Sequence, residues 1–128
     1  MNVELQAYSG QSQIACALIQ GFWKAHNGYD QPLSEAMEDL AAWTSAGHRL
    51  YFILSYGVPA GFIHLGSRGA DIDWLEDIFV LPAYQGKGIG TEIVTRLKDM
   101  VMEAAEQGDN IMFILGAAAG KEGFYEKL

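Results

Sequence analysis

The residues best suited to binding chemistry form the glycine-rich run Gln85–Gly90. The apolar segment before it ends at Pro82, which cannot donate to a sheet ladder, and an apolar stripe of helical period follows it. A strand, a glycine loop and a helix in this order leave free main-chain N–H groups at a helix start, where the helix dipole favours negative charge. Glycines also let a ligand approach the backbone closely. The run therefore predicts an anion site.

The spacing of the glycines argues against two common nucleotide-binding loops. Lys87 stands between glycines and not after them, as a Walker A loop requires, and Thr91 occupies the place of the third glycine of G-x-G-x-x-G. The pattern that fits is Q-x-x-G-x-G, made by Gln85, Gly88 and Gly90 directly after V-L-P. With the run L-E-D-x-F-V before it, this string resembles the pyrophosphate loop of the GNAT superfamily, the acyl-CoA-dependent N-acyltransferases. The likeness is to small-amine members such as the spermidine/spermine acetyltransferases.

The resemblance implies acetyl-CoA as co-substrate and a place for each part of it. Gln85 would shape the loop, and main-chain amides would hold the pyrophosphate at Gly86, Lys87, Gly88, Ile89, Gly90 and Thr91. The main chain of the preceding strand would face the pantetheine arm at Ile78, Phe79 and Val80. A bulge that splays this strand from the next one would free ladder groups, so that the arm could pair like an extra strand.

Acyl transfer from a thioester to an amine needs a base for the amine, hydrogen-bond donors for the thioester oxygen and an acid for the leaving thiolate. The chain has no nucleophile motif such as G-x-S-x-G, so direct attack by the amine is expected. The base candidates are Glu76 and Asp77, and strand alternation predicts that only one of them faces the substrate. The resemblance favours Glu76, acting through water, with Asp77 as the alternative, and it gives Tyr125 in G-F-Y-E-K-L the role of the acid.

Hydrophobic periodicity predicts the elements that carry these residues. We expect strands over 2–8, 49–56, 60–66, 72–81 and 110–115, and helices over 11–26, 32–45, 89–107 and 121–128. The inner side of the second helix is expected to consist of Leu33, Met37, Leu40 and Thr44. The 110–115 strand is apolar throughout its middle, which suits a parallel neighbour, and it would close a βαβ unit. The expected fold is a mixed α/β (α+β) sheet in one N-acetyltransferase domain over residues 1–128.

Composition limits the classes of partner. The chain has 128 residues, half of them hydrophobic, which is enough for one domain with a core. A net charge of −8 argues against nucleic acid and favours a cationic substrate. No apolar run approaches the ~20 residues of a membrane span, and no secretion signal is seen, so we expect a cytoplasmic protein without membrane contact.

The cysteine and the histidines are expected to have structural roles. Cys16 is the only cysteine, which suits a reducing compartment, and it reads as an apolar filler on a helix. His26, His48 and His64 fall in separate elements without metal-ligand spacing, so no metal is expected. His64, on an expected strand, is interpreted as a hydrogen-bonded structural residue.

Two departures from the family pattern bear on assembly and activity. Gly116–Gly120 replaces an Asn that contacts the cofactor in many members, and the sequence stops at Leu128, where members usually continue with one or two strands. The 110–115 strand would then be an exposed apolar edge, which proteins rarely leave bare. A truncated chain, a covering subunit and a shortened member are the three explanations, and we expect self-association as a homodimer. The alternative function is a non-catalytic acyl-CoA-binding module that regulates a partner.

Overall fold

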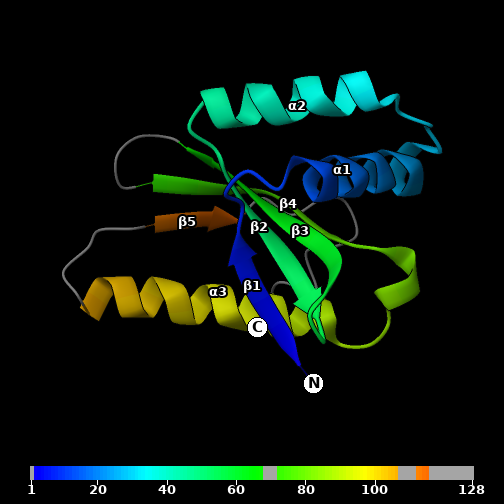
Figure 1. Ribbon diagram of the computed structural model, residues 1–128. Coiled ribbons are helices and arrows are strands. Elements are labelled where there is room, and N and C mark those ends of the chain that lie inside the picture. The colour runs from blue at the N-terminus through cyan, green and yellow to red at the C-terminus, as the bar shows by residue number, and fades with distance from the viewer. Residues whose placement is uncertain (1, 68–71, 107–111, 116–128) are drawn as a thin grey trace.

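The computed structural model describes residues 2–67, 72–106 and 112–115 (Figure 1). Its elements are β1 (Val3–Ala7), α1 (Ser12–Asn27), α2 (Leu33–Ser45), β2 (Arg49–Ser55), β3 (Val58–Ser67), β4 (Ile72–Val80), the 3₁₀ turn η1 (Pro82–Tyr84), α3 (Ile89–Glu106) and β5 (Met112–Leu115). The expected strands and helices within these ranges are confirmed, with ends that differ by one or two residues. The helix expected over 121–128, and Tyr125 with it, lies outside the described residues.

The sheet has the strand order β1-β2-β3-β4-β5. Neighbouring strands are antiparallel except β4 and β5, which run parallel and are connected through α3. Helices α1 and α2 cover one face of the sheet and α3 covers the other (Figure 1). The expected mixed sheet and its parallel pair are therefore confirmed.

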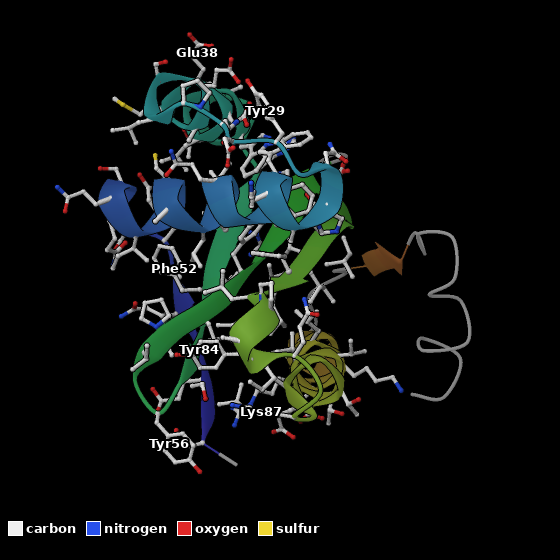
Figure 2. All side chains as sticks on the ribbon, turned by 90° about the vertical axis from the view of Figure 1, so that its right-hand side faces the viewer. Tyr29, Glu38, Phe52, Tyr56, Tyr84 and Lys87 are labelled. Carbon is white, nitrogen blue, oxygen red and sulfur yellow. The ribbon has the colours of Figure 1, made fainter. Side chains whose placement is uncertain are left out.

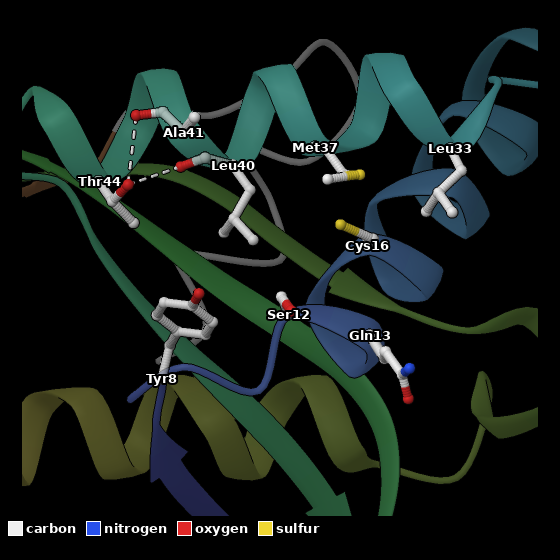
Figure 3. A pocket seen from close by; sticks show the side chains of 9 residues that line it. All are labelled: Tyr8, Ser12, Gln13, Cys16, Leu33, Met37, Leu40, Ala41 and Thr44. Carbon is white, nitrogen blue, oxygen red and sulfur yellow. Dashed lines mark hydrogen bonds between the residues drawn. The ribbon is translucent and has the colours of Figure 1, made fainter.

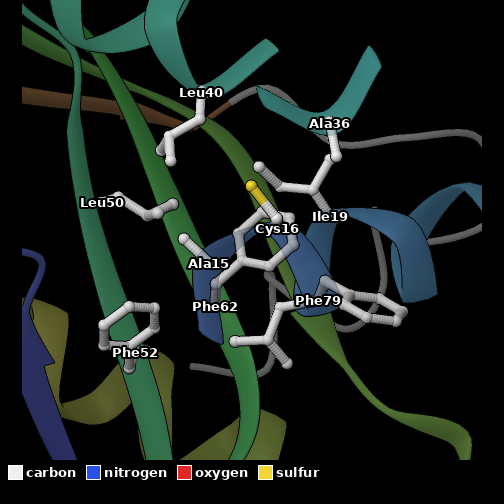
Figure 4. Packing of buried hydrophobic residues seen from close by; sticks show 10 residues of the cluster. Ala15, Cys16, Ile19, Ala36, Leu40, Leu50, Phe52, Phe62 and Phe79 are labelled. Carbon is white, nitrogen blue, oxygen red and sulfur yellow. The ribbon is translucent and has the colours of Figure 1, made fainter. Parts of the chain in front are cut away.

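Each face of the sheet has its own core because successive strand residues point to opposite sides. On the α1–α2 side, Phe52, Phe62 and Phe79 pack against small and branched residues of the two helices (Figure 4). On the other side, Ile53, Ile63, Leu65 and Leu75 pack against α3, which contributes Ile89, Ile93 and Leu97. The start of α3, where the glycine loop ends, is thus fixed in a hydrophobic core.

The buried side of α2 differs from the expected one. Leu33 and Met37 are each 57% exposed, and the α2 residues in the core are Ala36 and Leu40. The expectation was correct for Leu40 and wrong for Leu33, Met37 and Thr44, which is also exposed. The small Ala36 side chain lets α2 approach α1 closely, and this turns the larger side chains of the expected stripe toward solvent.

The end of β4 is held tightly against β3. A Cβ atom on Gly61 would lie 1.9 Å from the carbonyl oxygen of Phe79, so only glycine fits there. The Leu81 amide, just beyond β4, donates to the Ala60 carbonyl at 2.8 Å. These contacts fix the point from which the glycine loop departs.

Candidate active site

The glycine loop joins η1 to α3 through two residues with left-handed backbone angles. Gly86 has φ 77° and Gly88 has φ 79°, a conformation that side-chain-bearing residues rarely adopt. Gln85 ties the loop to the preceding strand, because its Nε2 donates to the Val80 carbonyl at 2.8 Å. Ile89 is buried and anchors the first turn of α3. Gln85 thus shapes the loop by a contact that the sequence did not reveal.

The main-chain amides of residues 86–91 have no hydrogen-bond acceptor within the described part of the chain. The ladder of α3 begins only with the Glu92 amide, which donates to the Gly88 carbonyl at 3.1 Å. Free N–H groups at a helix start favour an anion through hydrogen bonds and the helix dipole. Lys87 adds a positive charge on the surface beside them, with Nζ 5.6 Å from the Tyr84 ring centre (Figure 2).

The strand before the loop is paired on both sides only along its first half. Residues 72–75 of β4 pair with 112–115 of β5. Toward the loop, β4 pairs with β3, and among the described residues none pairs with its other side. The Val80 carbonyl is occupied by Gln85. The residues that follow Leu115 lie outside the described part, so the expected slot for pantetheine beside Ile78, Phe79 and Val80 stays a prediction.

A bulge in β4 brings both acidic residues to one face of the sheet. His64 pairs with Asp77 and the next residue, Leu65, pairs with Leu75, so Glu76 is the extra residue of the bulge. The Glu76 side chain lies over Gly66, where an added Cβ would be 2.7 Å from Oε1. Gly66 lies two residues from His64, so it shares the α1–α2 face of the sheet.

Asp77 lies on that same face, because its Oδ2 is 3.0 Å from Nδ1 of His64. The expectation that only one of Glu76 and Asp77 can face the substrate side is therefore wrong, since a bulge interrupts strand alternation. A bulge was expected between this strand and its next neighbour, and the register shift observed here is in the pairing with β3.

Asp77 belongs to a chain of three side chains from three parts of the sequence. His64 Nε2 lies 2.7 Å from Nδ1 of His48, which precedes β2. The ring of Trp43 on α2 stacks on His64 with centroids 4.0 Å apart and an interplanar angle of 24°. His64 is only 4% exposed, and both of its ring nitrogens are hydrogen bonded, as expected for a structural histidine. Within the described residues, no group of three or more His, Cys, Asp and Glu side chains could hold a metal ion.

Sequence reasoning missed the contact between His48 and His64. It treated the histidines as separate because their elements are separate in the chain. The usable signal was the hairpin of β2 and β3, whose antiparallel register brings the residue before β2 close to the end of β3. That register includes a shift between Ile53 and Leu54, which the sequence pattern does not reveal.

The connection between α1 and α2 is held by polar side chains. Trp23 Nε1 and Gln31 Nε2 both donate to Oδ2 of Asp39, at 3.2 and 2.8 Å. The Tyr29 hydroxyl donates to Glu35 at 2.7 Å, and this bond raises the pKa of Tyr29. Tyr29 and Trp23 thus link this connection to α2 by hydrogen bonds.

A hollow of about 440 Å³ lies between the first turns of α1 and the exposed side of α2 (Figure 3). Its lining residues are Tyr8, Ser12, Gln13, Cys16, Leu33, Met37, Leu40, Ala41 and Thr44. Cys16 contributes to the core beneath it, and burial raises the pKa of its thiol, which makes it a poor nucleophile at neutral pH. The apolar-filler interpretation of Cys16 is confirmed.

Residues 16–128 match the sequence model of the Acetyltransferase (GNAT) family. A possible acetyltransferase from Clostridium difficile 630 shares the fold, with 13% identity and a TM-score of 0.75 over 99% of this chain and 89% of that one. A GNAT acetyltransferase from Elizabethkingia anophelis with acetyl-CoA bound matches with 17% identity and a TM-score of 0.64, over 98% of this chain and 74% of its own.

A third similar structure is the aminoglycoside N-acetyltransferase AAC(6')-Iy in complex with the bisubstrate analogue CoA-S-monomethyl-acetylneamine. It has 16% identity and a TM-score of 0.63, over 99% of this chain and 86% of that one. No curated protein matches the sequence.

The chain belongs to the GNAT acetyltransferase family. It is an acyltransferase of the class that uses acetyl-CoA as the acyl donor, as the glycine loop and the strand before it predicted. Among the described residues, no helix is long and apolar enough to cross a membrane.

Proposed function

We propose that the protein is an N-acetyltransferase that moves the acetyl group of acetyl-CoA to a primary amine of a small molecule or to a terminal amine. The observation that carries the proposal is a helix start with free main-chain amides, which follows a strand that presents two carboxylates on one face. The free amides at the helix start suit a diphosphate. The two carboxylates on the strand suit a cationic amine that must lose protons.

The donor would lie across the loop and the end of β4. In this arrangement the pyrophosphate accepts hydrogen bonds from the amides of Gly86 to Thr91, and the Lys87 ammonium adds charge near it. The pantetheine arm runs beside Ile78, Phe79 and Val80. The chain has a net charge of −8, so an anionic cofactor depends on this local positive potential.

Glu76 is the better base of the two acidic residues. Its side chain is exposed and has no hydrogen-bond partner among the described residues, whereas Asp77 Oδ2 is bound to His64. Glu76 would take a proton from the amine through a water molecule as nitrogen attacks the thioester carbonyl. Tyr125, on the resemblance of its G-F-Y segment alone, is the acid that protonates the leaving thiolate.

The acceptor is proposed to be a cationic small amine. The acid excess of the chain and the carboxylates of Glu76 and Asp77 favour a positively charged ligand before its deprotonation. The aminoglycoside N-acetyltransferase with the similar fold adds amino sugars to the candidates. Polyamines, amino acids, arylalkylamines and amino sugars therefore form the panel to be tested.

The test is thiol release from acetyl-CoA with that panel. We expect turnover with at least one amine, a fall in kcat of about 10²- to 10⁴-fold in Glu76→Gln, and a smaller fall in Tyr125→Phe. Glu4→Gln, an exposed acid on β1, is the matched control and should keep wild-type rates. Tight CoA binding without turnover across the whole panel would instead favour the non-catalytic binding module. Full activity in both site variants would refute these assignments.

We also propose that the protein forms a homodimer near the edge of the sheet at β5. Strand β5 pairs with β4 on one side, and among the described residues nothing pairs with its other side. Light scattering at rising protein concentration should show a dimer. A mass that stays monomeric at the highest concentration would contradict this proposal and leave the catalytic one intact.

A further inference from the structure

Two protons must leave the acceptor nitrogen in the proposed reaction. A primary amine arrives at neutral pH as R–NH₃⁺, and the amide product keeps a single N–H. One of the departing protons ends on the sulfur of CoA and the other is released to solvent. The exposed carboxylate of Glu76 can hold only one proton at a time, so the chemistry calls for a second acceptor.

We infer that His48 is this second acceptor and that His64 and Asp77 position it. The inference rests on the proposed function and deepens it. In the step, a lone pair on His48 Nε2 takes a proton from the bound ammonium, directly or through water, and leaves the neutral amine. Glu76 then takes the next proton as the C–N bond forms and the C–S bond breaks. That proton balances the one that the leaving thiolate takes up, and His48 returns its own proton to solvent.

Asp77 sets the direction of donation along the hydrogen-bonded side chains of His48, His64 and Asp77. An ionised carboxylate only accepts, so Asp77 Oδ2 requires the proton on Nδ1 of His64, 3.0 Å away. His64 Nε2 is then an acceptor, and the contact of 2.7 Å requires the proton on Nδ1 of His48. His48 Nε2 is consequently left with a lone pair that no described residue occupies. The hydrogen-bonded chain therefore accepts protons at its His48 end, and the half-buried Asp77 is the counter-charge at the other.

The register of the sheet is what relates His48 to Glu76. Arg49 pairs with Leu65 and Leu50 with His64, so one further step of this register would set His48, which lies just before β2, across from Gly66. Gly66 is also the residue over which the Glu76 carboxylate lies. A glycine between them leaves the space that a side chain would fill. The two acceptors thus flank one position on the α1–α2 face.

The surroundings suit a transient positive charge on the imidazole pair. Trp43 stacks on His64, and an aromatic face attracts a cation. Among the side chains that the structure describes, the charged groups placed on this face of β4 are Asp77, which is bonded to His64, and Glu76, which lies over Gly66. Helix α2 presents the uncharged Trp43 to the imidazole pair. The Asp77 carboxylate and the aromatic ring lie where they can stabilise an imidazolium while it holds the proton.

The first test determines the tautomers of His48 and His64 directly, without an amine substrate. Long-range ¹H–¹⁵N NMR of the full chain labelled at histidine, at a pH where the imidazoles are neutral, should show the proton on Nδ1 of both His48 and His64. His26→Gln removes the only other histidine and assigns the signals. In Asp77→Asn the new amide can donate to His64 Nδ1, so both histidines should switch to the Nε2–H tautomer. Wild-type protein with His64 protonated at Nε2 would overturn the inference.

The second test uses the amine panel and acetyl-CoA. His48→Gln should lower kcat about 10²-fold near neutral pH with little change in the KM of acetyl-CoA. The loss of kcat should shrink as pH rises, because a larger fraction of the amine substrate is then already neutral and needs no proton acceptor. A purely structural role of His48 would give the same loss at every pH, and that result, or no loss at all, would refute the inference.

The control and the fold check accompany both tests. His26→Gln should keep wild-type rates, because His26 is exposed and its one hydrogen bond among the described residues is with the Phe22 carbonyl. Circular dichroism melts of all variants exclude unfolding as the cause of a loss. If no amine supports turnover, the proposed function fails. The tautomer measurement alone then decides whether the hydrogen bonds of His48, His64 and Asp77 run in the inferred direction.

Discussion

Glu76 owes its position to a backbone irregularity of a single residue. As the extra residue of the bulge in β4, it projects over Gly66 on the face that also carries Asp77. Without the bulge, strand alternation would send one of the two carboxylates toward α3. Gly66 completes the arrangement because it has no side chain to compete for the space. At this scale the proposed acid–base chemistry depends on one inserted residue, Glu76, and on the absence of a side chain at Gly66.

Replacement of Gly66 tests this arrangement. A Cβ in Gly66→Ala would lie 2.7 Å from Glu76 Oε1 and 3.2 Å from its Cγ, so the carboxylate must move. We expect kcat to fall roughly tenfold, in the range that misplaced catalytic groups cost, while the melting temperature changes little.

A double-mutant cycle gives the control for that prediction. In a Glu76→Gln background, Gly66→Ala should have no further effect on kcat, because the group it displaces no longer acts. An equal loss in both backgrounds would show that Gly66 serves the site in another way.

The element that would form the proposed anion site is the start of α3 together with the turn before it. Gly86 and Gly88 direct the chain so that the amides of residues 86–91 have no acceptor among the described residues, and Gln85 fastens the turn to the end of β4. Buried Ile89 holds the first turn of the helix against the sheet. The loop is thus already formed before a ligand arrives, which lowers the entropic cost of binding.

Gly88→Ala should weaken CoA binding, because alanine in a left-handed conformation costs about 1–2 kcal/mol and shifts the loop amides. That cost corresponds to a loss of roughly 5- to 30-fold in affinity by titration calorimetry. Gly57→Ala is the matched control, since Gly57 has φ 78° in the turn between β2 and β3. It should lower stability by a similar amount and leave CoA affinity unchanged. An equal loss of affinity in the two variants would point to general destabilisation.

At the scale of the whole molecule, two cores hold one sheet between three helices. The core under α1 and α2 contains Phe52, Phe62 and Phe79, and it supports the face that carries His64 and Asp77. The core under α3 fixes the anion loop from the opposite side. Because β4 contributes to both cores, the proposed donor site and the proposed acid–base cluster are held by the same strand.

The orientation of α2 in this assembly gives a stability prediction. Leu40→Ala should lower the free energy of unfolding by about 2–5 kcal/mol, the usual cost of a buried leucine. Leu33→Ala, on the same helix but 57% exposed, should change it by less than about 0.5 kcal/mol. Urea denaturation of both variants measures the difference. Equal losses would mean that α2 packs through the side that periodicity alone predicted.

The order of the described elements, the family and the glycine loop between β4 and α3 were all predictable from the sequence. They depend on local signals, namely apolar periodicity, Pro82 at the end of a strand and the spacing of Gln85, Gly88 and Gly90, which any short stretch of chain carries by itself. Leu40 was correctly predicted to be buried on the inner side of α2, whereas the same prediction for Leu33 and Met37 was wrong. The apolar pattern of a helix fixes its period, but the helix can still rotate about its axis and bury a neighbouring stripe of residues.

Only the tertiary structure decided that Glu76 and Asp77 share a face and that His48 bonds to His64. Both facts follow from register, which arises from the pairing of distant strands and shifts at bulges that leave no mark on local periodicity. The sequence therefore specified which groups were available for the chemistry, and the packing of β2, β3 and β4 determined which of them meet.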